Sequence, residues 1–306
     1  MKKKKYGSTL LVAVIAVAAI GWQKIGGDSI GNHIESLEEG VEDASLDTPK
    51  NQAGEGLSKA DFSYVSPKWE KSGEPSQMLQ RIAYVTSYNK TTLCPNWVGW
   101  VLTAAHTDGN NERGGHKFLE DMDVPTPRAT YADIREKECG YQRGHMCPAA
   151  DNKWSYQAQK QAFLMTNICP QNGSLNQKDW KYLEEACRDW ALRYGKVYIV
   201  AGPIFTSKRI KRVGEHRIAV PDAFFKVVLR MGTAKNGKTV KNGKNNASPQ
   251  AIGFIYPNKG THHDMSYYVR SVDEVEKMTG LDFFSPLPDN IEHRVESKSD
   301  LAEWEK

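Results

Sequence analysis

The chain has 306 residues, of which 39% are hydrophobic and 25% are charged, and its formal net charge is +4. These proportions are ordinary for a globular protein and exclude a wholly disordered chain, and the length allows one large domain or two small ones. Eight tryptophans and thirteen tyrosines favour a packed, partly β interior. The absence of a CxxC pair disfavours a cysteine-based zinc or thioredoxin-type site.

Residues 1–22 have the layout of a secretory signal peptide or signal anchor. Four consecutive lysines precede an uncharged apolar run from Tyr6 to Trp22. No clean small-x-small cleavage site precedes the polar stretch, so an uncleaved membrane anchor stays open. A buried core helix is the less favoured alternative, because four lysines suit a membrane surface better. We expect an exported protein that is periplasmic, extracellular or membrane-anchored with its globular part outside the cytoplasm.

Residues 23–75 are predicted to form a flexible acidic linker. They hold eleven acidic residues and five lysines, a net charge of −6, and few large apolar groups. Such a segment buries too little apolar area to offset the entropy of ordering it. The remaining residues, 76–306, are expected to form the globular domain and carry a net charge of +6. That excess suggests, weakly, an anionic ligand.

The globular part is predicted to be an α+β domain, because strands occur in runs with helices inserted between them. Alternating and aromatic-rich segments predict an antiparallel pair over 81–89 and 96–106, and strands over 196–205, 217–231 and 249–258. The doubled KNGK within 235–245 predicts an exposed hairpin tip. Helices are predicted over 155–165, 176–194 and 271–280, the last with a capping box from Ser271 to Glu274. The five cysteines are interpreted as buried structural residues, although export would permit disulfides.

Three motifs in order carry a family resemblance: QRGH at 142–145, TNICPQ at 166–171 and LNQKDW at 175–180. With flanking pieces such as PNWVGWVLT and DEVEKMTGLDFF, the chain resembles the DNA/RNA non-specific endonucleases over roughly residues 80–290. The resemblance implies the ββα-metal (His-Me finger) nuclease fold, a mostly antiparallel sheet with helices packed on it. It also implies metal-dependent hydrolysis of DNA and RNA with little sequence preference, leaving 5′-phosphate ends. The family usually has DRGH, so Gln142 replaces an aspartate.

The residues of the first motif also suit phosphodiester hydrolysis by themselves. The reaction needs an activated water and stabilisation of developing negative charge. A histidine has an unperturbed pKa of about 6.5, which suits His145 as a general base near neutral pH. Arg143 can fork onto phosphate oxygens at any working pH. Gly144 lets the backbone pass close to a phosphate.

The resemblance assigns further residues to the site. Asn176 is implied to be the direct ligand of a divalent cation, and an asparagine oxygen suits Mg²⁺ or Mn²⁺ better than zinc. Glu184, two turns along the same helix, is implied to hold water around that ion. Asn167 is implied to be positional, Gln171 to contact substrate, and Arg128 to stabilise charge on the phosphate. DNA and RNA are the expected partners, recognised through the phosphate backbone, with the membrane as a further partner if the leader stays attached.

Each of the three central residues has a structural alternative. Asn176 could cap the helix, since asparagine is a preferred N-cap residue. Glu184 could be a solvated helical acid paired with Lys181 or Arg188. His145 could be a buried histidine of the core.

The whole domain also has an alternative role. Because Gln142 lacks the charge of the usual aspartate, the chain could be a catalytically weakened nuclease-fold module that binds nucleic acid on a membrane stalk.

Overall fold

A computed structural model describes residues 58–70, 73–111, 115–232 and 248–305. The predicted leader, most of the predicted linker and the KNGK hairpin tip lie outside these residues. Within the part of the chain that the structure describes, no helix has both the length and the apolar character needed to cross a membrane.

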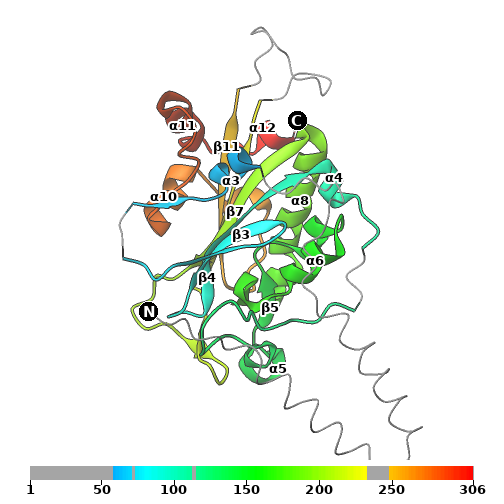
Figure 1. Ribbon diagram of the computed structural model, residues 1–306. Coiled ribbons are helices and arrows are strands. Elements are labelled where there is room, and N and C mark those ends of the chain that lie inside the picture. Colours follow the sequence, from blue (N-terminus) through cyan, green and yellow to red (C-terminus); the bar gives the residue numbers. More distant parts are fainter. Residues whose placement is uncertain (1–57, 71–72, 112–114, 233–247, 306) are drawn as a thin grey trace, which may run out of the picture. The chain divides into compact units, whose positions relative to one another are not determined.

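A seven-stranded antiparallel sheet forms the centre of the domain, in the order β12-β11-β10-β7-β4-β3-β2 (Figure 1). Its strands are β2 (Gln77–Gln80), β3 (Tyr84–Asn89), β4 (Cys94–Thr103), β7 (Lys196–Ile204), β10 (Ala223–Arg230), β11 (Gln250–Pro257) and β12 (Val269–Arg270). The predicted pairing of the first two segments is confirmed, and so is the α+β class. The segment predicted as one strand over 217–231 contains two, because β9 (Ile218–Ala219) pairs with β8 (Arg212–Val213) apart from the main sheet.

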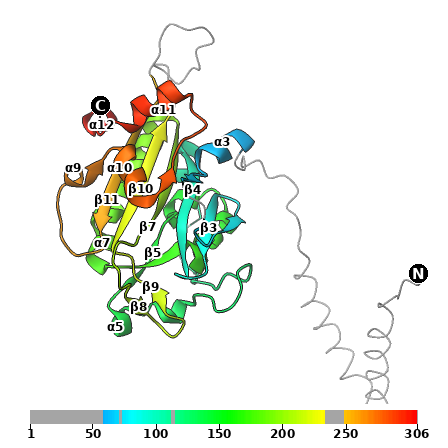
Figure 2. The ribbon, with the colours of Figure 1, turned by 90° about the vertical axis from the view of Figure 1, so that its left-hand side faces the viewer.

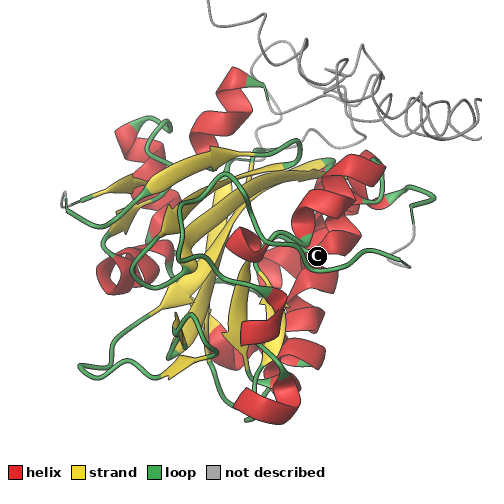
Figure 3. Ribbon diagram, turned by 60° about the horizontal axis from the view of Figure 1, so that its bottom comes forward, coloured by secondary structure: helices red, strands yellow, loops and turns green. Residues whose placement is uncertain are grey.

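Helices cover both faces of the sheet, so most of its strand residues are buried (Figure 1 and Figure 3). One face packs against α8 (Asp179–Tyr194), and the other packs against α10 (Val272–Thr279) and α11 (Asp289–Glu296). Alternation along β4 divides the two cores, since Trp100 joins the α8 side and Trp97 joins the α10 side. The remaining helices are α3 (Lys59–Tyr64), α4 (Ala104–Thr107), α5 (Glu136–Cys139), α6 (Tyr156–Ala162), α7 (Gly173–Gln177), α9 (Met265–Tyr268) and α12 (Ala302–Glu305).

The prediction of a linker over 23–75 is wrong for residues 58–70, which belong to the folded domain. Ser58 caps α3, and β1 (Lys68–Trp69) pairs with β13 (Leu281–Asp282). Val65 is fully buried in the core on the α10 side. The high acid content of the segment obscured this short apolar stretch. One of those acids, Asp61, accepts hydrogen bonds from the domain itself, from Lys196 and Tyr198.

Two helix predictions are confirmed, and the third describes two helices instead of one. Residues 155–165 contain α6, and α10 has the expected capping box and ends at Gly280 in the left-handed conformation. Residues 176–194 are divided at Lys178, whose φ of −120° and ψ of −91° separate α7 from α8. The apolar residues Trp180, Leu183, Cys187 and Trp190, spaced three or four apart, therefore all belong to α8.

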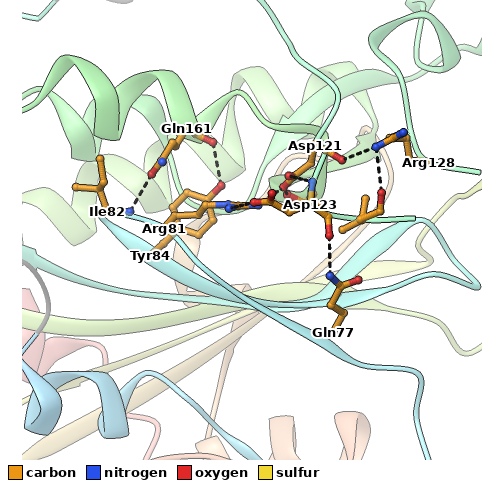
Figure 4. A network of polar contacts seen from close by, with 10 residues as sticks. Gln77, Arg81, Ile82, Tyr84, Asp121, Asp123, Arg128 and Gln161 are labelled. Carbon is orange, nitrogen blue, oxygen red and sulfur yellow. Dashed lines mark hydrogen bonds and ion pairs between the residues drawn. The ribbon is translucent and has the colours of Figure 1, made fainter. Parts of the chain in front are cut away.

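A buried ion-pair network fixes the connection between β4 and β5 to the edge of the sheet (Figure 4). The Arg81 guanidinium lies between Asp121, at 2.5 Å, and Asp123, at 2.6 Å. Asp121 also accepts a hydrogen bond from Thr166, just before β6 (Ile168–Gln171). This connection contains Arg128, so the network sets the position of a predicted site residue.

The network predicts that replacing Asp121 and replacing Asp123 will lower the free energy of unfolding by different amounts. The Asp121 side chain is 4% exposed and the Asp123 side chain is 63% exposed. Asp121→Ala leaves the buried Arg81 charge undercompensated and is expected to lower the free energy of unfolding by about 3–5 kcal/mol. Asp123→Ala is the matched control and is expected to cost about 1 kcal/mol at most. Urea unfolding of the two variants measures the difference, and equal losses would contradict this account.

Candidate functional site

A two-stranded ribbon followed by a helix carries most of the predicted site residues. The strand β5 (Gln142–His145) pairs antiparallel with β6, so that Gln142 is opposite Gln171 and His145 is opposite Ile168. The chain then continues through α7 into α8. The resemblance implies a ββα fold, and these elements follow that order, although no strand is predicted from the sequence at 142–145 or 168–171. The ribbon is separate from the seven-stranded sheet.

Arg143 and His145 point to the same side of the ribbon, as alternation along a strand requires. Both contact Phe118. The Arg143 Cζ atom is 4.7 Å from the Phe118 ring centroid, and the two ring centroids of His145 and Phe118 are 5.4 Å apart. The His145 ring also packs edge-on against Phe163, at 5.0 Å. These two aromatic rings therefore restrict the plane of the imidazole, and the His145 residue is only 9% exposed.

The Arg143 guanidinium is held in place by backbone carbonyls. Its Nη1 donates to the carbonyl oxygens of Tyr131, at 3.0 Å, and Ile134, at 3.1 Å. A guanidinium has five N–H donors, so this anchoring leaves donors for an anion. Arg143 is thus a fixed positive charge beside His145.

Arg128 is held by a different set of groups. It donates to the carbonyl oxygens of Asp121 and Val124 and lies 3.7 Å from Glu120. These groups all belong to the connection between β4 and β5, so the structure places Arg128 in the segment that precedes the ribbon.

Gly144 makes room for a buried glutamine. A Cβ atom at this position would lie 2.1 Å from Oε1 of Gln171 and 2.6 Å from its Cβ. Gln171 is fully buried, and neither atom of its amide has a hydrogen-bond partner among the described residues. The glycine is therefore needed for packing inside the ribbon, a reason different from the close phosphate approach predicted for it. The predicted substrate contact of Gln171 would require its buried amide to become accessible.

A chain of three side chains orients Asn176. Gln142 Nε2 donates to Glu136 Oε1 at 2.9 Å, and Asn176 Nδ2 donates to Gln142 Oε1 at 2.9 Å. A carboxylate is only an acceptor, so Glu136 fixes the direction of both amides. Asn176 must therefore direct its Nδ2 toward Gln142 and its Oδ1 away from it.

The capping alternative for Asn176 is not what the structure shows. The cap of α7 is Asn172, whose Oδ1 accepts from the backbone N–H groups of Ser174 and Leu175. Asn176 lies in the last turn of that short helix. Its oxygen is thus not used for helix capping.

Helices α7 and α8 run beside the chain from 142 to 151 and contact it at three levels. These contacts are Asn176 to Gln142 at 2.9 Å, Trp180 to the His145 carbonyl at 3.2 Å, and Arg188 to Asp151 at 3.0 Å. Glu184 lies on α8 between Trp180 and Arg188. Burial raises the pKa of the Cys147 thiol, and the charge of Glu184 adds to this effect. Because the His145 carbonyl accepts from Trp180, His145 lies beside the stretch of helix between Asn176 and Glu184. The three central residues are therefore collected on one structural unit.

Glu184 is half-buried on α8, so it is not a fully solvated helical acid. Its charge acts on Arg188, which also pairs with Asp151. Lys181, the other partner considered for it, pairs with Glu185 at 3.5 Å.

Asn167 is a positioning residue. It is fully buried, its Oδ1 accepts from the Cys147 N–H at 2.9 Å, and its Nδ2 donates to the carbonyls of Cys147 and Ala162. All these groups are backbone groups, so Asn167 holds the segment that follows His145.

Two buried charges beneath the ribbon had no counterpart among the predicted residues. Asp151 accepts from Trp100 Nε1 and pairs with Arg188, although burial raises the pKa of its carboxyl. Lys226 is fully buried, with its Nζ 4.4 Å from the Trp180 ring centroid. A lysine inside the apolar strand AFFKVVLR was the one available signal in the sequence.

Comparisons with known proteins identify similar chains across the same region. A family described as DNA/RNA non-specific endonuclease matches residues 68–290. A nuclease of Nostoc sp. is 33% identical over 73% of this chain and 78% of its own length, and Nuclease C1 of Cunninghamella echinulata is 34% identical over 70% and 85%. The mitochondrial nuclease EXOG of Xenopus laevis is 34% identical, and the match spans 59% of it. A chain in the crystal structure of the EndoG/EndoGI complex superposes with a TM-score of 0.61 at 25% identity, covering 71% of this chain and 89% of its own.

Proposed function

Because the chain belongs to the family of DNA/RNA non-specific endonucleases and is thus a phosphodiester hydrolase, we propose that His145 is its general base and that Asn176 holds its divalent cation. The observation that carries the proposal is the hydrogen-bond chain from Glu136 through Gln142, which turns the Asn176 oxygen outward. Members of this family generally depend on divalent metal ions.

The donor set fits a hard cation. Asn176 offers one neutral amide oxygen, and ions such as Mg²⁺ prefer oxygen ligands and take only one or two from the protein when a phosphate supplies the rest. Glu184 lies on α8 between Trp180 and Arg188, where it would hold water around the ion. The bound cation supplies charge neutralisation on the phosphate and its leaving oxygen. We propose Mg²⁺ or Mn²⁺ as that cation.

The remaining residues act on the water and the phosphate. His145 would take the proton of the attacking water, and Phe118 and Phe163 keep its ring in one plane for that transfer. Arg143 would contribute its unused N–H groups to a phosphate oxygen, already positioned by two carbonyls. Arg128 would add positive charge near the phosphate from the adjacent connection.

Recognition of the backbone explains cleavage of both DNA and RNA. Phosphate contacts carry no sequence information and are sensitive to salt. The net charge of +6 on residues 76–306 agrees with such contacts.

Gln142 is compatible with catalysis. Its amide donates to Glu136 and accepts from Asn176 at the same time. An aspartate in its place could accept from Asn176 but would repel Glu136. The glutamine therefore matches its acidic neighbour and preserves the orientation of Asn176, which favours an active enzyme over the weakened binding module.

Replacement of the proposed base tests the enzyme against the binding module. His145→Ala is expected to reduce Mg²⁺-dependent cleavage of supercoiled plasmid and of RNA by about 10²–10⁴-fold, because the proton acceptor is lost. His263→Ala, an exposed histidine that stacks on Tyr267, is the control and should cleave normally. Retained nucleic-acid binding with no cleavage by the unaltered protein, with or without metal, would instead establish the binding module.

Removal of the first member of the hydrogen-bond chain tests the orientation of Asn176. Glu136→Ala releases Gln142 and is expected to raise the Mg²⁺ concentration for half-maximal cleavage by about 10–100-fold. Glu138→Ala, on the same short helix, removes only an exposed pair with Arg135 and should leave that concentration unchanged. If both variants needed the same Mg²⁺ concentration for half-maximal cleavage, the proposal that Glu136 orients Asn176 for cation binding would be contradicted.

We also propose that the nuclease domain acts outside the cytoplasm, on the strength of the basic and apolar segment at residues 1–22. Deletion of these residues is expected to move the protein from the exported or membrane fraction to the cytoplasmic fraction. Immunoblots of separated fractions measure this, and an unchanged distribution would contradict the proposal.

A further inference from the structure

Three carboxylates converge on the face of the sheet opposite α8. Asp273 and Glu276 come from α10, and Glu296 comes from the end of α11; Figure 2 looks onto this face, with both helices in front of the strands. One carboxylate oxygen from each lies within 4.8 Å of the other two. Oxygens that share one calcium ion at its usual bond length are at most about 5 Å apart, so this spacing fits a single ion.

Glu296 is the residue that points to a ligand. It is 5% exposed, and its Oε1 has no hydrogen-bond partner among the described residues. A buried carboxylate without a partner is costly. The largest charge effects on it come from the neighbouring acids Glu276, Glu292, Asp273 and Asp282.

Burial and this crowding change the acidity of the cluster. Burial, followed by repulsion from neighbouring acids, raises the pKa of Glu296 to about 9. Burial also raises the pKa of Glu276 to about 7, although the Phe283 N–H donates to it. The cations near the rim, Lys68 and His293, act on the outer acids Asp282 and Glu292.

We propose that Asp273, Glu276 and Glu296 form a second metal site, which binds Ca²⁺ and connects α10 to α11. Calcium accepts six to eight oxygens in flexible geometry, and the exposure of Asp273 leaves room for water to complete the shell. Mg²⁺ is a poorer match because it demands near-octahedral geometry. The site is independent of the proposed function, since the ribbon and α8 lie on the other face of the sheet.

The test uses the full chain, stripped of metal with a chelator and titrated with CaCl₂ by calorimetry and thermal unfolding. At a free Ca²⁺ concentration about 100 times the Kd, the Tm is expected to rise by about 5–10 °C. Glu296→Gln should raise the Tm without metal and abolish the gain with Ca²⁺. Asp273→Asn, at an exposed position that tolerates substitution, should also remove calorimetric binding.

Two matched variants separate this site from the nuclease site. Asn176→Ala and Glu185→Gln should both bind Ca²⁺ as the unaltered chain does, while Glu296→Gln should still cleave plasmid with Mg²⁺. Absence of a binding isotherm in the unaltered chain overturns the proposal. Binding that persists in Glu296→Gln but disappears in Asn176→Ala also overturns it, because the ion would then occupy the nuclease site.

Discussion

The docking of α7 and α8 beside the segment 142–151 is the constraint on which the site depends. Trp180 donates to the His145 carbonyl and is itself fully buried, so the strand that carries the histidine cannot shift without opening the core. The same contact line aligns Asn176 with Gln142 and Arg188 with Asp151. The candidate site is therefore built from packing and hydrogen bonds that also contribute to the stability of the domain.

The periodic parts of the fold could be predicted from the sequence. Aromatic and β-branched runs located the strands, and Ser271, Glu274 and Gly280 marked both ends of α10. The break at Lys178 was not predicted, because neither proline nor glycine marks it in the sequence and lysine itself suits a helix. The folded stretch 58–70 was missed for a related reason. Its position depends on partners distant in the sequence, such as Tyr198, which donates to Asp61 from 137 residues away.

The candidate site was predictable only as far as its motifs extend. The three motifs located His145 and Asn176, but nothing in the sequence of α5 distinguished Glu136 from an exposed helical acid. Its role depends on a contact with Gln142 that forms only when the helix packs near the ribbon. For Gln171, the motif suggested a role that the structure does not support directly. Its motif suggested substrate contact, whereas the structure reveals a buried amide that accounts for Gly144.

The two proposed cation sites differ in where their negative charge comes from. Asn176 contributes a neutral oxygen, so the phosphate must supply most of the attraction, and tight ion binding is coupled to the presence of substrate. Asp273, Glu276 and Glu296 contribute up to three charges themselves, and those charges repel one another in the absence of an ion. The first arrangement suits a cation that takes part in turnover, and the second suits one that remains bound as part of the fold. The sheet between them allows the same chain to hold both without competition.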